Sequence, residues 1–415
     1  MNTFKVSELK DNTYFSDDLL LDKQFLLVPT TVPVSESLIK ALEDWSFTDV
    51  VSEGTQGLQN SMPSSVEEVF SEDDITKTEV LSGSVLAENI RKVLESSERE
   101  NTEGDADAAR ISVVEKVFAE YMKYISAVYT HYATHKDINF DEISEIVKEF
   151  CVFIKENRRF VLRVKPDQEA HDRNFLVSHA LRSTTIAIVI GMQLRLPLTK
   201  LVELGVSCLL HEIGMIRLPP QLYMTDRPLT PSEKKAIFTH PLLSYEILKG
   251  LKFPLSICLG ALEHHEKENG TGYPRHLASD KISLYAKIIS VACAFEAITA
   301  PRHYKEAQSP YEAMVEMLNK NRQFYDETVI KALLYCLSLF PIGCYVFLSD
   351  GKVAQVIDVN PDNPKNPIVQ VVSTNGSNGE PQVIPTSDTG IRIVRALSKE
   401  ETEDVIKLSS QKQQA

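Results

Sequence analysis

The sequence predicts a mainly α fold, in which a helical core is flanked by a small N-terminal α+β module and a small C-terminal β module. Apolar residues recur at helical spacing almost without interruption over residues 111–339. Two helix start signals lie inside that region, and strand-like runs separated by turns begin after Pro341. A chain of 415 residues is long enough for two or three such parts.

The first 52 residues mix two kinds of pattern. β-prone apolar runs occur at residues 25–28 and 48–51, and residues 36–45 have the spacing of a helix that begins after Ser35. We therefore expect a small α+β module over residues 1–52.

The next segment is acidic. Residues 53–109 carry 14 acidic and 4 basic side chains and are rich in serine and threonine. Such a composition is typical of a solvated chain that cannot bury a core of its own. We expect an acidic linker over residues 53–110 that is largely disordered or partly helical, with one helix around residues 85–93.

The central region contains the two helix start signals. In residues 230–233 and again in 309–312, a hydroxyl residue precedes a proline, and a glutamate stands at the third helical position. This arrangement is that of a capping box with proline at the first turn. We expect connecting helices over residues 111–164 and a helical domain over 165–340.

The C-terminal part changes to strand-like spacing. Apolar runs at residues 345–348, 353–357 and 368–372 are separated by turn-forming Asp, Asn, Gly and Pro. We expect a small β module over residues 341–398, followed by a polar tail over 399–415.

The charge of the chain disfavours a nucleic-acid partner. There are 44 Lys and Arg against 58 Asp and Glu, which gives a formal net charge of −14. A protein held on DNA or RNA by phosphate contacts usually has a basic face. We therefore expect neither DNA nor RNA as a partner.

Cysteine usage and hydropathy indicate a cytoplasmic protein. The six cysteines lie far apart without a Cys-x-x-Cys pair, and the sequence does not start like a signal peptide. The longest apolar stretch, residues 184–192, ends at Gln193 and Arg195, well short of the roughly 20 residues of a membrane span. We expect no membrane insertion.

Histidines are concentrated in the helical domain. A lone histidine on an apolar helix is more often a hydrogen-bonded core residue than a ligand. Here, however, Glu212 directly follows one histidine after the apolar run 206–210, and two adjacent histidines precede Glu266 and the glycine-rich stretch 270–274. Several imidazoles around a carboxylate suit iron, manganese or zinc, whereas calcium or magnesium would require more oxygen ligands. The five histidines concerned are His179, His211, His240, His264 and His265.

These residues resemble, in order and spacing, the HD-GYP family, a branch of the HD superfamily of metal-dependent phosphohydrolases. The resemblance covers roughly residues 164–372 and implies a helical HD-GYP core. It is carried by His179 in an apolar helix and by the segments Leu210-His211-Glu212-Ile213-Gly214, Thr239-His240-Pro241, His264-His265-Glu266 and Gly270-Thr271-Gly272-Tyr273-Pro274.

The resemblance implies a bacterial signalling enzyme that hydrolyses cyclic di-GMP to linear pGpG, to GMP or to both, by metal-activated hydroxide. It implies two divalent metal ions, usually iron or manganese, with zinc as a further candidate. The implied metal ligands are His179, His211, Glu212, His240, His264, His265 and Cys293, with His211 and Glu212 in catalytic roles. The signature loop Gly272, Tyr273 and Pro274 borders the substrate cleft of the family and contacts protein partners there.

Three basic residues are further candidates for substrate contacts. Arg182 lies three residues after His179 and so on the same side of that helix, where it can meet a guanine or phosphate or form a surface ion pair. Arg302 and Lys305 can line the cleft or lie on the solvated surface.

The sequence also departs from the family pattern. Glu212 replaces the bridging aspartate and adds a methylene, and Met215 replaces a lysine that contacts the substrate phosphate. Cys293 replaces an aspartate ligand and is either a thiolate ligand or a buried neutral thiol. Phe175 occupies the position of a glutamate in members with a third metal, so we expect at most two ions.

Two hypotheses follow. The first is a working cyclic di-GMP phosphodiesterase with reduced activity. The second is a degenerate HD-GYP module that binds a nucleotide or a protein partner without cleaving it, and a phosphohydrolase acting on another nucleotide also remains open. A homodimer through the helices over residues 111–158 is a further expectation.

Overall fold

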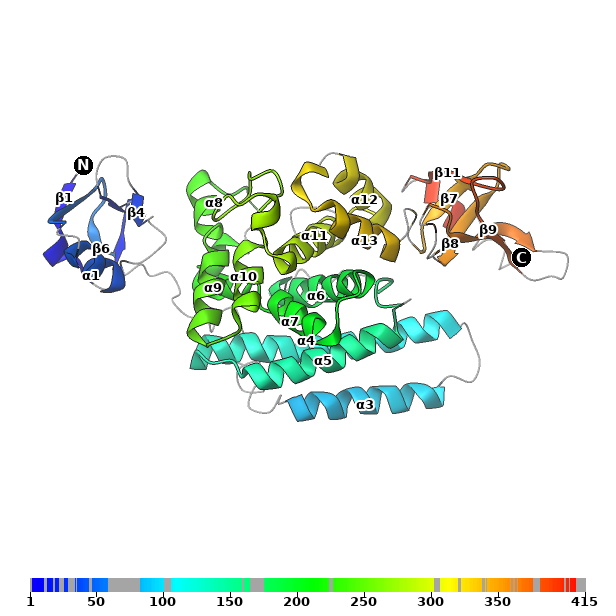
Figure 1. Cartoon of the computed structure of the whole chain (residues 1–415), viewed down its shortest axis with the longest axis horizontal. Helices are drawn as coiled ribbons and strands as arrows, with labels where there is room; N and C mark the ends of the chain where they lie inside the picture. Colours follow the sequence, from blue (N-terminus) through cyan, green and yellow to red (C-terminus); the bar gives the residue numbers. More distant parts are fainter. Residues whose placement is uncertain are drawn as a thin grey trace.

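The fold is described by a computed structural model of the chain (Figure 1). The predicted positions Arg302 and Lys305, most of the expected polar tail and much of the expected acidic linker lie outside the described residues. The described residues are 2–10, 13–17, 19–21, 26–28, 34, 36–44, 47–58, 83–100, 106–158, 160–164, 175–223, 227–301, 307–319, 322–337, 340, 342–358, 360, 363, 365–375, 381–398, 401–402 and 404–407.

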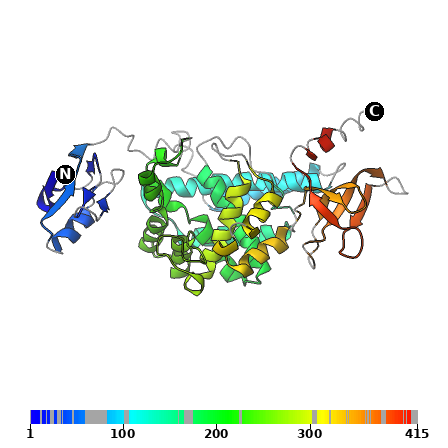
Figure 2. The same ribbon diagram turned by 90° about the horizontal axis from the view of Figure 1, so that it is seen from above.

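The described chain is mostly helical and has three parts, as the sequence predicts. Both views place the N-terminal module and the C-terminal sheet at opposite ends of a helical body (Figure 1 and Figure 2). Each part has its own apolar core, so the helical body can hold a site without help from the two sheets.

The N-terminal module contains two small sheets and one helix. Strands in the order β1-β5-β3-β4 form one antiparallel sheet, and β2 pairs with β6. Buried Leu19, Val34 and Val50 fill the space between the sheet and the helix. The elements are β1 (Asn2–Lys5), η1 (Val6–Glu8), β2 (Tyr14–Phe15), β3 (Leu19–Leu20), β4 (Leu26–Val28), α1 (Glu36–Asp44), β5 (Asp49–Ser52) and β6 (Gln56–Leu58).

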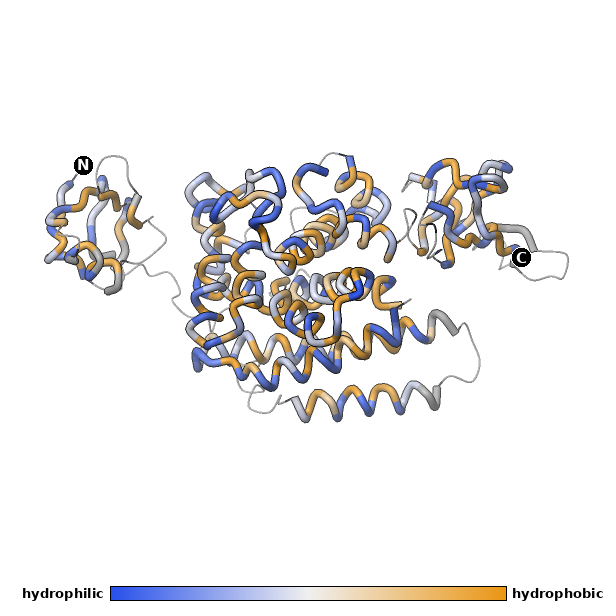
Figure 3. The backbone as a smooth tube through the Cα atoms, in the orientation of Figure 1, coloured by the Kyte–Doolittle hydropathy of each residue, from blue (hydrophilic) through white to orange (hydrophobic). Residues whose placement is uncertain are grey.

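The helical body begins with long helices that underlie the shorter ones (Figure 1). Apolar and polar stretches alternate along α3 and α5, as expected for helices that pack through one face (Figure 3). The elements are α3 (Gly83–Glu100), α4 (Ala106–His135), α5 (Phe140–Glu156), α6 (Phe175–Gln193), α7 (Leu198–Leu209), η4 (Ile213–Arg217), η5 (Pro220–Leu222), α8 (Pro231–Ile237), α9 (His240–Gly250), α10 (Leu255–Glu263), η6 (Ser279–Lys281), α11 (Leu284–Thr299), α12 (Pro310–Asn319), η7 (Arg322–Phe324) and α13 (Glu327–Leu337).

Helix α6 is the centre of the body. It packs against α7 and α11 and contributes to both large apolar clusters of the domain. Among the described residues it is the one helix long and apolar enough to cross a membrane, but 78% of that stretch is buried inside the fold. This burial is that of a core helix, and His179 is among its buried residues.

Both predicted capping boxes are confirmed. Thr230 accepts a hydrogen bond from Glu233 N, and the Glu233 carboxylate accepts one from Thr230 N, so α8 begins where the sequence places it. Ser309 and Glu312 make the same pair of bonds at the start of α12. Helix starts set by such local hydrogen bonds fix the direction in which the following turn enters the core.

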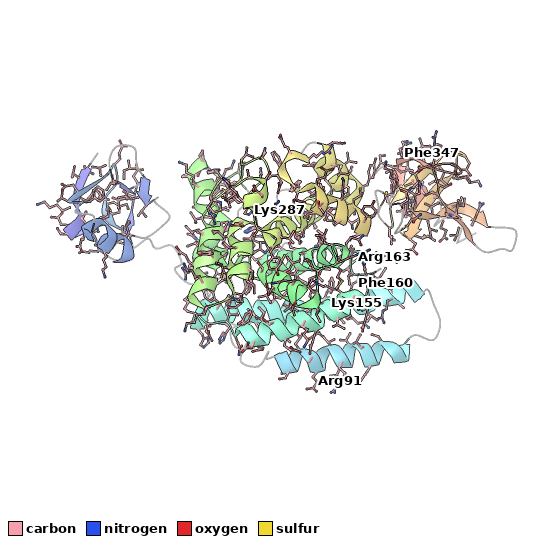
Figure 4. The ribbon with its side chains drawn as sticks, viewed as in Figure 1. Arg91, Lys155, Phe160, Arg163, Lys287 and Phe347 are labelled. Carbon is pink, nitrogen blue, oxygen red and sulfur yellow. The ribbon has the colours of Figure 1, made fainter. Side chains whose placement is uncertain are left out.

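The C-terminal part is a five-stranded antiparallel sheet in the order β10-β9-β8-β7-β11. Val346 and Leu348 of β7 are buried, while Phe347 between them, labelled in Figure 4, faces the other side beneath the Arg395 guanidinium. The three predicted strands are confirmed. The elements are β7 (Tyr345–Leu348), β8 (Val353–Asp358), β9 (Ile368–Asn375), β10 (Pro381–Pro385) and β11 (Ile393–Ala396).

Candidate metal centre

The seven predicted metal-ligand residues come together in the helical body. They belong to α6, to the turn after α7, to the start of α9, to the end of α10 and to α11. They form two groups, and within each group the potential ligand atoms lie within 4.8 Å of one another. The carboxylate group is Glu212, His240, His264 and His265, and the sulfur group is His179, His211 and Cys293.

The sulfur group is held by hydrogen bonds on the outer sides of its rings. His211 Nδ1 donates to the Cys208 carbonyl oxygen at 2.5 Å, and His179 Nδ1 donates to Glu296 Oε2 at 2.5 Å. The Nε2 atoms therefore face inward, 3.3 Å apart, and Cys293 Sγ lies 3.2 Å from His211 Nε2. Two nitrogens and one sulfur thus point at a common position.

The carboxylate group is built in the same way. His240 Nδ1 donates to the Ile237 carbonyl oxygen at 2.6 Å, and His264 Nδ1 donates to that of Ala261 at 2.7 Å. Since a carbonyl oxygen can only accept, each neutral ring carries its proton on Nδ1 and a lone pair on Nε2. The two Nε2 atoms lie 3.3 Å apart. Two facing lone pairs repel each other unless a cation lies between them.

Glu212 connects the two groups. Its Oε1 lies 3.8 Å from His211 Nε2, and its Oε2 lies 3.4 Å from His240 Nε2. Oε2 is buried and has no hydrogen-bond partner among the described residues. A buried carboxylate oxygen without a partner is unfavourable, and coordination of a cation would satisfy it. The residues present therefore fit a pair of divalent ions bridged by Glu212.

The ionisation states agree with this interpretation. Burial raises the pKa of Glu212, but the positive charge of the neighbouring imidazoles in their protonated forms, His240 first, outweighs burial and lowers this pKa to about 2, so the carboxylate is ionised. Burial and repulsion from neighbouring imidazoles hold the pKa of His264 and His265 well below the usual range. Both rings are thereby kept in the neutral form that binds metals.

The sulfur group holds protons when no metal is bound. Burial lowers the pKa of His179, but the adjacent Glu296 carboxylate outweighs it and raises this pKa to about 10. Burial raises the pKa of the Cys293 thiol to about 11. A cation entering this group would replace protons, as is usual for metal ligands.

Glu296 lies behind His179 as its carboxylate partner. Its side chain is 2% exposed, and its second oxygen lies 3.4 Å from Arg182 Nε. A carboxylate that accepts from the outer nitrogen of a metal-binding histidine fixes the ring and raises its basicity. Sequence spacing gives no signal of this contact, because the two residues are 117 positions apart. Arg182 thus lies against Glu296, at the edge of the centre.

The signature loop is held by two buried glutamates that the sequence analysis gave no role. Glu266 accepts from the backbone nitrogens of Arg275 at 2.6 Å and Leu277 at 2.9 Å. Glu263 accepts from Ser283 N at 2.8 Å. Their signal in the sequence is the placement of two acids next to the two adjacent histidines at the end of an apolar helix. Glu266 is therefore a loop-positioning residue and belongs to neither metal group.

The loop also lies close to the chain around His265. A Cβ added at Gly272 would lie 2.5 Å from three main-chain atoms of residues 265–267, so the close approach requires glycine. Farther along, Lys287, labelled in Figure 4, pairs with Glu268 at 3.0 Å and Asp326 at 3.1 Å. Gly272, Tyr273 and Pro274 are thus fixed next to the carboxylate group.

Gly214 sets the distance between the turn that carries Glu212 and helix α9. A Cβ there would meet the His240 carbonyl oxygen and would lie 2.6 Å from Ser244 N. We expect Gly214→Ala to destabilise the protein by about 1–3 kcal/mol, because the turn must move away from α9. Chemical denaturation measures this change. Gly250→Ala is the control, since nothing lies within 4 Å of a Cβ there, and equal effects of the two variants would contradict the prediction.

Met215 faces an apolar cluster. Its side chain is 5% exposed and packs with Leu218 and Leu222, in a cluster that Phe175 borders. The position that the family fills with a phosphate-contacting lysine is therefore part of the core here.

A charge at position 215 would be buried. We expect Met215→Lys to lower the free energy of unfolding by roughly 2 kcal/mol or more, because an ammonium would lie among apolar side chains. Thermal unfolding monitored by circular dichroism measures the effect. Met215→Leu should change stability little, and a lysine variant as stable as the leucine variant would show that the side chain reaches solvent.

Residues 166–329, which contain both ligand groups, match the family model described as an HD domain. This domain is homologous to those of HD-GYP cyclic di-GMP phosphodiesterases. Cyclic di-GMP phosphodiesterase PdeB of Borreliella burgdorferi is 29% identical over 225 residues, which are 53% of this chain and 59% of that protein. Cyclic di-GMP phosphodiesterase PA4108 of Pseudomonas aeruginosa is 29% identical over 52% of this chain and 51% of that protein.

The chain spans between half and three fifths of the length of these two relatives. Among solved structures, Bd1817, an HDG"Y"P protein from Bdellovibrio bacteriovorus, matches 80% of this chain and 97% of its own at 15% identity. Its TM-score is 0.47.

Proposed function

We propose that this protein is a metal-dependent phosphodiesterase that hydrolyses cyclic di-GMP to pGpG, to GMP or to both, with reduced turnover. One observation carries the proposal: the two ligand groups meet at Glu212, which directs one oxygen toward each of them. The names and the 29% identity of the PdeB and PA4108 relatives support the choice of substrate.

The two ligand groups and Glu212 would bind the metal ions. The sulfur group would hold one cation, the carboxylate group the other, and Glu212 would bridge them. Two such ions, iron or manganese in this proposal, would supply an activated water and would stabilise charge on the phosphodiester oxygens. Arg182 and the loop Gly272 to Pro274 lie beside the two groups and are the proposed contacts for the nucleotide.

The second candidate is a module that binds the dinucleotide or a protein partner without cleaving it. Two observations favour it. Met215 is uncharged and its side chain is buried in an apolar cluster, so position 215 contributes no cation to the site. Cys293 offers a single sulfur where an aspartate would offer two hard oxygens. Both changes act against catalysis more than against metal binding.

Metal analysis and one set of rate measurements separate the candidates. The purified protein is analysed for bound metals and then incubated with cyclic di-GMP, bis-p-nitrophenyl phosphate or a mononucleotide, with added manganese or iron(II). Bound metal together with cleavage of cyclic di-GMP supports the first candidate. Bound metal and dinucleotide binding without cleavage support the second. A protein that holds no metal and binds none of these compounds contradicts both.

A further inference from the structure

His265 is held differently from the other four imidazoles. His211, His240 and His264 each donate from Nδ1 to a main-chain carbonyl oxygen, and His179 pairs with Glu296. In the part of the chain that the structure describes, neither ring nitrogen of His265 makes a hydrogen bond. The contact that normally orients a metal-binding histidine is therefore missing at this one ring.

A stack of three rings takes its place. The His265 and Tyr273 rings lie 4.6 Å apart between centroids with their planes at 18°, and the Tyr273 and Phe238 rings lie 4.2 Å apart at 19°. His240 makes an edge contact with the same stack: its ring centroid lies 5.0 Å from that of His265, and the two ring planes are nearly perpendicular at 87°. Rotation of the His265 ring would break the stacking and the edge contact together.

The outer ring of the stack is not explained by core packing. Phe238 is 46% exposed, although it follows the last residue of α8 directly and stands two residues before His240. Its ring partner among the described residues is Tyr273. Tyr273 belongs to the loop fixed by Glu266 and Gly272. The stack thus joins the corner between α8 and α9, the signature loop and one ligand of the carboxylate group.

We propose that Phe238 is a positioning residue for the carboxylate group: through Tyr273 it fixes the plane of the His265 ring and so sets the affinity of that group for its cation. The proposal rests on the proposed function, because it requires a bound ion. Loss of an outer partner of a metal ligand typically lowers metal affinity about 10- to 100-fold. The sulfur group contains no member of the stack, so its affinity should be unaffected.

The experiment is a cobalt(II) titration of the full chain, followed by calorimetry and by the near-ultraviolet absorption that a thiolate ligand gives cobalt. Phe238→Leu keeps an apolar side chain but removes the ring, and Phe238→Tyr keeps the ring. Leu242→Ala is the matched control, since Leu242 is 45% exposed on the neighbouring helix α9 and outside the stack. We expect Phe238→Leu to weaken one of two binding steps about tenfold or more, Phe238→Tyr to restore it, and the thiolate absorption to stay.

The outcomes that overturn the proposal differ from those that overturn the proposed function. Two unchanged binding steps in Phe238→Leu refute the positioning role, and so does an equal weakening of both steps, which would indicate a general effect on the fold. A wild-type protein that binds no cobalt refutes both proposals. A wild-type protein that binds two ions without cleaving cyclic di-GMP refutes the enzymatic function alone.

Discussion

Replacing Glu212 by glutamine is expected to lower hydrolysis of cyclic di-GMP about 100-fold or more and to reduce the metal content. The substitution preserves size but removes the negative charge, and only one of the two terminal atoms remains an acceptor. Because the two oxygens of Glu212 face different ligand groups, at least one of the proposed ions would lose a ligand. A displacement of about 1 Å at such a site already costs about a hundredfold in rate. Elemental analysis and rates with added manganese measure both effects.

Glu246→Gln is the control for this variant. Glu246 lies on α9, 53% exposed and 3.9 Å from Arg217, so the same chemical change there should leave metal content and rate unaltered. Thermal unfolding gives a second measurement. An ion at about 100 times its dissociation constant stabilises a folded protein by about 2.7 kcal/mol, and Glu212→Gln should lose much of that gain. Full metal content and an unaltered rate in Glu212→Gln would exclude the bridging role.

The features that the sequence predicts well are those set by neighbouring residues. The hydroxyl groups of Thr230 and Ser309 act on backbone groups three residues away, so the starts of α8 and α12 can be inferred without knowledge of the fold. Buried and partly exposed residues alternate along β7, β8 and β9, and turns bound each of these strands. The two-residue strands β2 and β3 are too short for any alternation of buried and exposed residues to identify them. Strand β2 pairs with the distant β6, and β3 pairs with the nearby β4 and the more distant β5.

In the candidate metal centre, too, the sequence predicts local features but not the contacts between distant segments. The histidines and Glu212 can be proposed from spacing and resemblance, but their distances depend on contacts between distant segments. Glu296 and His179 meet because α6 and α11 pack together. The stacking of Phe238 depends on the path of the signature loop. Met215 stands one residue after Gly214, and nothing in that local sequence indicates that its side chain turns into an apolar cluster.

Glu212 illustrates how a departure from a family pattern can be absorbed. Its extra methylene is long enough to displace the carboxylate oxygens by about one bond length. In the structure the longer side chain still directs Oε1 and Oε2 toward separate groups, at 3.8 Å and 3.4 Å from the nearest ring nitrogens. The substitution at position 293 differs from that at position 212, because it replaces a carboxylate oxygen by a sulfur and so changes the donor atom rather than the length of the side chain.

Replacing Cys293 by aspartate is the change expected to raise activity. Sγ lies 3.2 Å from His211 Nε2, so a carboxylate at this position would face the same ion and offer it hard oxygen donors, which manganese and iron(II) prefer over a single sulfur. We expect hydrolysis with manganese to increase about tenfold or more, at least the size of an outer-partner effect. The thiolate absorption of the cobalt-loaded protein should disappear. Initial rates and the cobalt spectrum measure the two changes.

The control for this variant is Cys293→Ser, which has neither a thiolate nor a carboxylate and should remain slow. In the absence of metal, Cys293→Asp should unfold at a lower temperature, because a new carboxylate is buried at a position only 9% exposed, and manganese should reverse that loss. Cys293→Asp should be tested alone before it is combined with Met215→Lys, because the destabilisation expected from the buried lysine would mask a gain in rate.

If Cys293→Asp holds two ions and is still slow, the donor at position 293 is not what limits catalysis. The missing cation near position 215 then becomes the main barrier, and the non-catalytic binding module becomes the better description of this protein.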